Sequence, residues 1–357
     1  MTMAQIPPVM LHNIHEQPDV VRRSIQLDLD VPDWFFVAER ITLVACGSSR
    51  HAALVAQHWI ESLARVSVRV LDASEWGDRA VLMEPRTGVI AISQSGRTKD
   101  VLETLRQMQS LGRAMPTLPE AAGLKILSLV NEAGSPLGMR SDATIVTPAG
   151  VEGAVAATKS FSAQLVVLAR LALMLAEAKG TLTSTQVQAL LSDLSQLPDA
   201  MAQTLKGLEQ QQRRTIRLER VPESVVILGR GLHIPIALEG ALKLKETCYV
   251  HAEGVGAGDF CHGPMAIVSP SLPIIALLPD EKMQVDLERF RSWGSPVMII
   301  HRRDDAIGSD LGFPVESVAD WLMPFMTVLP LQLLAYDWAV TKGLDVDQPR
   351  YLTKFIG

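Results

Sequence analysis

A run of hydroxyl side chains follows one predicted strand in the first half of the chain. The strand covers residues 88–92, and Ser93-Gln94-Ser95-Gly96-Arg97-Thr98 separates it from a helical pattern. Ser95 is placed to cap this helix, with Thr98 near its third position. Free N–H groups at a helix N-terminus, together with hydroxyls and an amide, can hold a phosphate without a lysine or a metal. The segment therefore predicts a phosphate site.

An earlier strand–helix turn offers the same chemistry through Ser48 and Ser49, in Cys46-Gly47-Ser48-Ser49. Serine and threonine at such turns are also ordinary helix caps, but two such turns in one domain favour a phosphate site. Two other phosphate motifs do not fit. No G-x-x-x-x-G-K-[ST] run occurs, and Ile234 stands where a dinucleotide fingerprint beginning at Gly229 and Gly231 needs its third glycine.

A predicted helix in the second half carries charges on one face. Glu239, Lys243 and Glu246 fall at positions i, i+4 and i+7. The ordinary explanation is a solvated ion pair worth roughly 0.3–0.5 kcal/mol. The helix follows a buried-type strand and is otherwise largely apolar, so the charged face can instead line a cleft. A carboxylate in such a cleft can move protons.

Two further candidates stand alone in the sequence. His262 follows sixteen residues after Glu246, and Lys354 lies three residues before the last residue. Lys354 is either a solubilising charge or an amine nucleophile on a tail that folds over a cleft. A zinc site built from His262 and its neighbours is an alternative, but the spacing matches no common structural site. Its ligands would be Cys248, His251, Cys261 and His262.

The elements that position these residues occur twice. Residues 41–64 and 224–248 each read as an apolar strand, a glycine-bearing turn and a helix. More strands follow each copy, with helices between them, and the polar residues 179–223 hold one or two helices. Alternating strands and helices predict two doubly wound α/β domains with parallel sheets, which bind ligands at the carboxyl ends of their strands. The further strands are predicted at 66–71, 89–93, 126–130, 143–147, 274–278 and 297–301, and helices at 101–111, 153–178 and 325–342.

Composition excludes several classes of protein. The 357 residues carry a net charge of −6 and no basic run, so a general nucleic-acid binder is not expected. The three cysteines are too few and too scattered for a disulfide framework. The N-terminus has no signal-peptide pattern. The apolar stretch 162–178 is interrupted by Arg170 and Glu177 and falls short of a membrane span. We expect a soluble, cytoplasmic protein.

Together these segments resemble the sugar-isomerase (SIS) family, and most closely the isomerase half of the glutamine–fructose-6-phosphate aminotransferases. The resemblance implies two SIS domains of three α/β/α layers and a homodimer with shared active sites. The expected divisions are an N-terminal segment 1–30, SIS domains at 31–195 and 196–343, and an active-site tail at 344–357. The matching stretches are 45–56, 93–105, 149–165, 237–266 and 330–354.

The resemblance also implies roles for the candidate residues. Ser93, Gln94, Ser95 and Thr98 would bind the phosphate of a sugar, with Ser48 and Ser49 contacting phosphate and sugar. Val155 would contact the sugar through its backbone. Glu246 would move a proton between C1 and C2, Lys243 would stabilise charge at the enediol stage, and Glu239 would be a further carboxylate. His262 of the partner subunit would open the ring, and Lys354 would form a Schiff base.

Departures from the pattern shape the hypothesis. The sequence begins about where the isomerase half would, so no glutaminase domain is expected. Ala157 replaces a sugar-contacting serine, Arg97 replaces an acidic residue, and residues 113–123 look inserted. With ammonia scarce relative to water, the leading hypothesis is an SIS-type glucosamine-6-phosphate deaminase that needs no metal or redox cofactor. The alternatives are an isomerase, deaminase or deglycase of another amino sugar phosphate, such as galactosamine-6-phosphate or a fructosamine-type adduct, ammonia-dependent synthesis, and a non-catalytic sugar-phosphate-binding regulator.

Overall fold

The chain forms two compact units in a computed structural model that describes residues 8–78, 84–114, 124–215, 221–305 and 311–354. We call them the N-unit and the C-unit. The N-unit holds residues 20–152, 159–195 and 354–357, and the C-unit holds residues 1–19, 153–158 and 196–353. The domain boundaries expected from the sequence stay a prediction.

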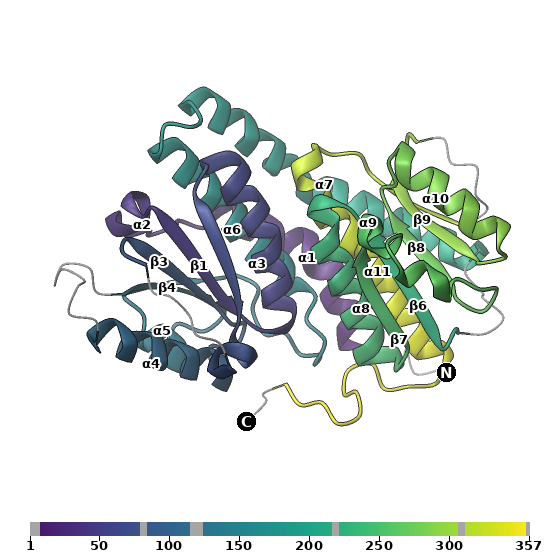
Figure 1. The fold of residues 1–357 in the computed structure, drawn as a ribbon, viewed down its shortest axis with the longest axis horizontal. Coiled ribbons are helices and arrows are strands. Elements are labelled where there is room, and N and C mark those ends of the chain that lie inside the picture. Colours follow the sequence, from purple (N-terminus) through teal and green to yellow (C-terminus); the bar gives the residue numbers. More distant parts are fainter. Residues whose placement is uncertain (1–7, 79–83, 115–123, 216–220, 306–310, 355–357) are drawn as a thin grey trace, which may run out of the picture. The chain divides into compact units, whose positions relative to one another are not determined.

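The N-unit is built on a five-stranded parallel sheet in the order β2-β1-β3-β4-β5. Its inner strands are apolar runs buried on both faces, as expected for a sheet covered by helices on both sides. Figure 1 shows α3 and α6 on one face and α4 with α5 on the other. The bounds are β1 Arg40–Ala45, β2 Ser67–Asp72, β3 Thr87–Ile92, β4 Lys125–Val130, β5 Ala143–Val146, α2 Asp33–Val37, α3 Gly47–Trp59, α4 Lys99–Ala114, α5 Pro136–Met139 and α6 Lys159–Ala178.

The C-unit repeats this plan with a parallel sheet in the order β10-β9-β8-β6-β7. Read from its other edge, the order is the same as in the N-unit, so the predicted pair of doubly wound domains is confirmed. Helices α8 and α11 pack on each other (Figure 1). The bounds are β6 Ser224–Gly229, β7 His251–Gly256, β8 Ile274–Leu277, β9 Val297–Arg302, β10 Gly312–Val315, α8 Ile234–Cys248, α9 Ala257–Phe260, α10 Glu281–Ser292 and α11 Met323–Thr341.

Two long helices complete the fold. Helices α1 (Val9–Gln26) and α7 (Ser184–Thr215) contribute residues to both units. The predicted helix at 153–178 begins only at Lys159. Strands β7 and β10 were not predicted, because β7 contains two glycines and β10 is only four residues long. Most of the expected insertion at 113–123 lies outside the described residues.

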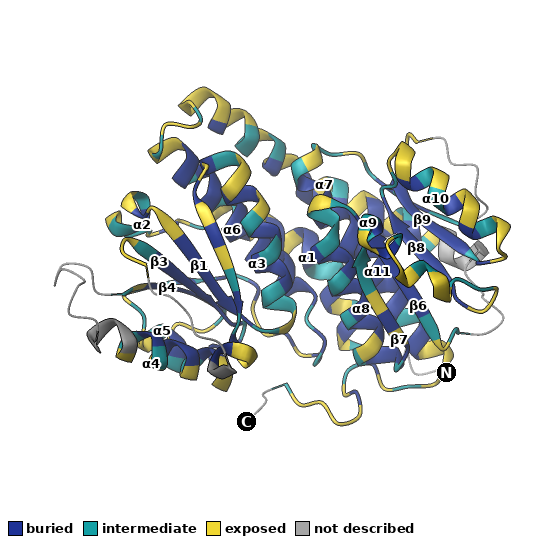
Figure 2. Cartoon of the chain, viewed as in Figure 1, coloured by how far each residue is buried: buried dark blue, intermediate teal, exposed yellow. Residues whose placement is uncertain are grey.

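Helix α6 is the one described helix that is long and apolar enough to cross a membrane. Of its apolar window, 78% is buried inside the structure, and Figure 2 shows the helix almost entirely in the colour of buried residues. This burial is typical of a core helix, since an apolar helix packed on all sides needs no lipid.

Candidate functional site

The loop after β3 is tightly organised by its own hydroxyl groups. Ser93 Oγ lies 2.8 Å from Thr98 Oγ1 and accepts the Gly96 N–H at 3.0 Å. Ser95 Oγ accepts the Arg97 N–H at 3.1 Å. Ser93 and Ser95 are buried, at 4% and 7% exposure. These bonds hold the loop in one conformation before any ligand arrives, which lowers the entropic cost of binding.

The prediction that Ser95 caps the helix is wrong. Helix α4 begins at Lys99, and the Thr98 carbonyl accepts the Leu102 N–H at 3.1 Å. Thr98 is therefore the residue that precedes the first helical turn, and Ser95 lies in a turn before it. The hydroxyls still follow the carboxyl end of a central strand, where open α/β sheets bind ligands.

The turn after β1 lies beside this loop in the N-unit sheet. β1 and β3 are paired neighbours, with Val44 opposite Ala91, so the segments that follow them begin at the same edge. Ser48 and Ser49 lie half-buried in the first turn of α3. Burial, reinforced by nearby carboxylates, raises the pKa of the Cys46 thiol to about 11. Cys46 is thus a neutral thiol and no nucleophile.

Asn131 is a residue of this site that the sequence analysis missed. Its backbone N–H donates to the Gln94 carbonyl at 3.0 Å, and its side-chain amide donates to the Gly150 carbonyl and to Ser160 Oγ, each at 3.1 Å. Asn131 Oδ1 accepts a bond from the Thr147 hydroxyl at 2.7 Å. Asn131 directly follows β4, so the same rule about strand ends would have found it.

The charged face of α8 is buried, not solvated. Lys243 Nζ lies 2.6 Å from Glu246 Oε2 and 3.4 Å from Glu239 Oε1. The Lys243 side chain is 1% exposed and that of Glu239 is 0% exposed, whereas that of Glu246 is 21% exposed. The ordinary explanation of a surface ion pair is therefore wrong. Of the three side chains in this cluster, that of Glu246 is the one that is partly exposed.

Lys243 carries a positive charge at the centre of this cluster. Burial by itself lowers the pKa of the Lys243 ammonium, but Glu239 and Glu246 outweigh burial and hold this pKa above its usual value. Because the ammonium is enclosed and contacts both carboxylates, this conformation does not expose it to an enediol oxygen. The geometry favours an action of Lys243 through Glu246.

The other predicted residues lie in separate segments of the chain. His262 is exposed in the turn after α9, where its N–H donates to the Asp259 carbonyl at 2.9 Å. The Val155 N–H donates to the Asp347 carbonyl at 3.1 Å within the C-unit. Lys354 is half-buried and groups with the N-unit. The structure thus brings together the hydroxyls in one unit and the α8 charges in the other.

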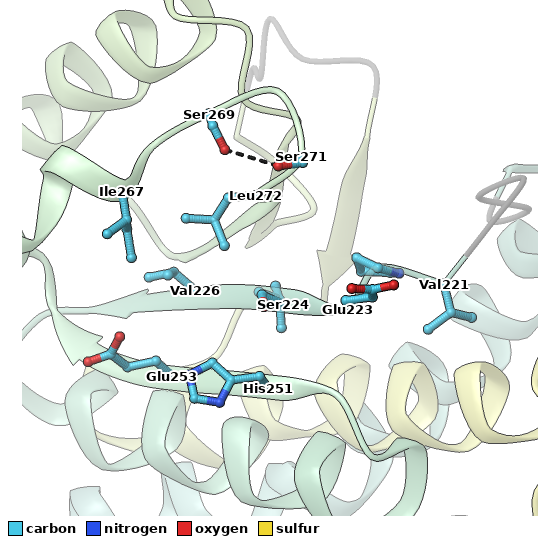
Figure 3. A pocket seen from close by; sticks show the side chains of 12 residues that line it. Val221, Glu223, Ser224, Val226, His251, Glu253, Ile267, Ser269, Ser271 and Leu272 are labelled. Atoms are coloured by element: carbon cyan, nitrogen blue, oxygen red, sulfur yellow. Dashed lines mark hydrogen bonds between the residues drawn. The ribbon is translucent and has the colours of Figure 1, made fainter.

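A pocket of about 550 Å³ opens in the C-unit at the amino ends of β6 and β7 (Figure 3). Its walls include Glu223, His251, Glu253, Ser269 and Ser271. It lies away from the carboxyl ends of these two strands, and of the residues predicted from the sequence only His251, a ligand in the zinc alternative, lines it. Among the described residues, no group of three His, Cys, Asp or Glu side chains is placed to hold a metal.

Comparison with known proteins decides the family. The SIS domain model matches residues 35–174 and again residues 220–342. The chain belongs to the SIS family. The resemblance noted in the sequence is thereby confirmed, and each matched region contains one of the two parallel sheets.

Individual SIS relatives agree with this assignment. The chain is 38% identical to a glutamine–fructose-6-phosphate aminotransferase (isomerizing) of Pseudomonas putida and 39% identical to one of Gloeobacter violaceus, each over 97% of this chain. It spans 58% of the length of these relatives. The structure of the C-terminal domain of glucosamine–fructose-6-phosphate aminotransferase from Francisella tularensis matches with a TM-score of 0.87 and 33% identity, over 98% of this chain and 100% of that one.

A second solved structure shares the fold of this SIS chain. It is a glucosamine-6-phosphate deaminase from Thermotoga maritima, which matches with a TM-score of 0.75 over 98% of this chain and 99% of that one. At 23% identity this likeness speaks for the fold alone.

Proposed function

We propose that this SIS chain interconverts glucosamine-6-phosphate and water with fructose-6-phosphate and ammonia. One observation carries the proposal: the buried Glu239–Lys243–Glu246 cluster leaves Glu246 as its partly exposed member. Moving a proton between two adjacent carbons requires one carboxylate whose position is fixed, and the Lys243 ammonium fixes Glu246 at 2.6 Å. The similarity to aminotransferases of fructose-6-phosphate indicates the class of substrate.

The proposed steps conserve every atom. The pyranose ring opens to the C1 aldehyde, and Glu246 takes the C2 proton and returns a proton to C1. A second proton moves from the nitrogen to the C1 oxygen, so the product is a C1 alcohol with a C2 imine. Water adds to the imine carbon, and the C2 nitrogen leaves as ammonia, which gives fructose-6-phosphate.

Other residues receive supporting roles in the same proposal. The hydroxyls of Ser93, Ser95 and Thr98 bind the phosphate, and Ser48 and Ser49 contact the sugar. His262 of a second copy opens the ring, which fits its exposure in the single chain and makes the active form a homodimer. Lys354 assists by forming a Schiff base with the ketose at C2 and exchanging with the amine. Glu239, Val155 and Gln94 complete the binding residues, and the protein acts in the cytoplasm.

The direction of the reaction separates two candidate functions. Deamination is our first choice, because water greatly exceeds free ammonia and mass action favours release. Synthesis of the amino sugar phosphate is the second, because the most similar relatives that we cite are named as aminotransferases of fructose-6-phosphate. Deamination or deglycation of another amino sugar phosphate, and binding of a sugar phosphate without turnover, are further outcomes of the test.

The test is an assay of the purified chain with a panel of amino sugar 6-phosphates. Ammonia and ketose phosphate are both quantified, and the reverse reaction is run with fructose-6-phosphate and ammonium. We expect equal amounts of ammonia and fructose-6-phosphate from glucosamine-6-phosphate. Product formed only from a different amino sugar phosphate would assign that compound as the substrate. Binding of a sugar phosphate without product would indicate a regulator instead of an enzyme.

A further inference from the structure

The segment after α11 is fastened to the C-unit through Asp347. The Asp347 carboxylate accepts hydrogen bonds from the backbone N–H groups of Val9 and Met10, each at 2.8 Å. Helix α1 begins at Val9, and the first N–H groups of a helix have no acceptor within the helix. A carboxylate at this position is stabilised by the bonds and by the helix dipole. Through its carbonyl, Asp347 also accepts the Val155 N–H.

A second fastening joins the same segment to α8. The guanidinium carbon of Arg350 lies 4.2 Å from the centre of the Tyr249 ring. The backbone N–H of Arg350 donates to the Tyr249 hydroxyl oxygen at 2.8 Å. Directly after α11, Lys342 Nζ donates to the Cys248 carbonyl at 2.7 Å. Tyr249 comes three residues after Glu246. The tail is thus attached to the end of the helix that carries the proposed base.

The backbone of Tyr249 indicates that its side chain is needed. Tyr249 ends α8 in the left-handed conformation, with φ of 56°. Glycine is the usual residue there, because a side chain costs roughly 1 kcal/mol in this conformation. A tyrosine at a position that favours glycine is explained by the two contacts that its ring and hydroxyl make with Arg350.

We propose that Asp347 and Tyr249 are positioning residues that hold the tail so that Lys354 reaches the sugar. We call the contacts of these two residues the tail clamp. Lys354 follows Arg350 by four residues, and four extended residues span at most about 14 Å. The tail clamp therefore keeps Lys354 within this distance of Arg350, which raises the effective concentration of its amine at a bound carbonyl compared with an unattached tail. The inference rests on the proposed function, in which Lys354 forms a Schiff base.

The first experiment tests the tail clamp without reference to catalysis. Limited trypsin cleavage after Arg350 is followed by mass spectrometry of the folded protein. Tyr249→Ala should speed this cleavage about tenfold, because it removes both the ring and the hydroxyl oxygen. Tyr351→Phe is the matched control, since Tyr351 is on the same tail and 95% exposed. Equal cleavage rates in Tyr249→Ala and the wild type would overturn the tail clamp.

The second experiment measures what the tail clamp does for Lys354. Fructose-6-phosphate is added with borohydride, whose hydride reduces the C=N bond formed when the Lys354 amine displaces the C2 oxygen as water. The rate of covalent labelling at Lys354 should fall about tenfold in Tyr249→Ala and Asp347→Ala. Tyr249→Phe, which keeps the ring, and Asp347→Asn, which keeps one acceptor oxygen, should recover much of it. The KM for the sugar phosphate should stay near the wild-type value.

The outcomes separate this inference from the proposed function. Labelling in the wild type that slows in the variants supports the positioning role. Wild-type labelling with an unchanged rate in Tyr249→Ala and Asp347→Ala overturns that role and leaves the proposed function standing. No labelling of Lys354 in the wild type overturns the Schiff base itself, and the positioning role is overturned with it.

Discussion

The ammonium nitrogen of Lys243 lies 2.6 Å from Glu246 Oε2, at a point where the lysine side chain is 1% exposed and the glutamate side chain is 21% exposed. This pair, together with the buried Glu239, places a charged cluster in an otherwise largely apolar helix. Buried ion pairs add little net stability, because taking the charges out of water offsets their attraction. A function of the exposed carboxylate explains the arrangement better than stability does.

Lys243→Met tests the cluster. Removing the cation takes the ammonium partner away from the buried Glu239 carboxylate and from Glu246, so the free energy of unfolding should fall by roughly 3–5 kcal/mol. Chemical denaturation of the two proteins measures this difference. Lys245→Met is the matched control, because Lys245 is exposed on the same helix, and it should change the free energy by less than about 0.5 kcal/mol. Similar losses in both variants would contradict a special role for Lys243.

Ser95→Ala combined with Thr98→Ala tests the phosphate loop. Hydrogen bonds to a charged group contribute roughly 1.5–3 kcal/mol each, so the KM for the sugar phosphate should rise at least about tenfold. Inhibition by inorganic phosphate should weaken in parallel, while inhibition by the unphosphorylated sugar should not change. If the KM is unaltered, the phosphate binds elsewhere.

Gly96→Ala tests whether the loop must approach its neighbour closely. Gly96 has a φ of +61°, and a Cβ there would lie 2.1 Å from Ser135 Oγ. We expect a KM for the sugar phosphate raised about tenfold. In Gly180→Ala the φ is +69° but no atom lies within 4 Å of the added Cβ, so this control carries the backbone cost of roughly 1 kcal/mol without the clash. Indistinguishable KM values in the two variants would refute the importance of this contact.

Asp337 predicts a pH dependence of stability. Burial raises the pKa of this carboxyl group on α11 to about 6, above its ordinary value of 3.8. Between these values the unfolded chain loses the proton first, so ionisation of Asp337 lowers the stability of the fold as the pH rises from about 4 to about 6. Asp337→Asn should raise the free energy of unfolding by roughly 1–3 kcal/mol at pH 7.5 and leave it nearly unchanged at pH 3.5. Denaturation at both pH values checks this, and an equal gain at both would contradict it.

Much of the fold could be predicted because local patterns encode it. The apolar runs that became β1 and β6 are each followed by a turn and a helix, and this repetition predicted two doubly wound α/β domains. Ser93 to Thr98 could be singled out because strand ends bind ligands in such sheets. The exact start of α4 could not be predicted, because Ser95 and Thr98 are both residue types that commonly precede a helix. In the structure α4 begins directly after Thr98.

Contacts between residues that are distant in the chain could not be predicted from the sequence. Spacing placed Glu239, Lys243 and Glu246 on one face of α8. It did not show that α11 packs against α8, where the Thr247 hydroxyl donates to the Ala335 carbonyl 88 positions further along the chain. The bond between Asp347 and the start of α1 joins residues 338 positions apart, and no local pattern signals it.

The most direct test of the central claim is the incorporation of deuterium from heavy water during turnover. The protein is incubated with glucosamine-6-phosphate in D₂O, and the C1 position of the fructose-6-phosphate formed is examined by NMR. Proton transfer through Glu246 predicts deuterium at C1 in the wild type and none in Glu246→Gln, although both proteins bind the sugar phosphate with similar affinity. Deuterium incorporated at the wild-type rate by Glu246→Gln would contradict the assignment of Glu246 as the base.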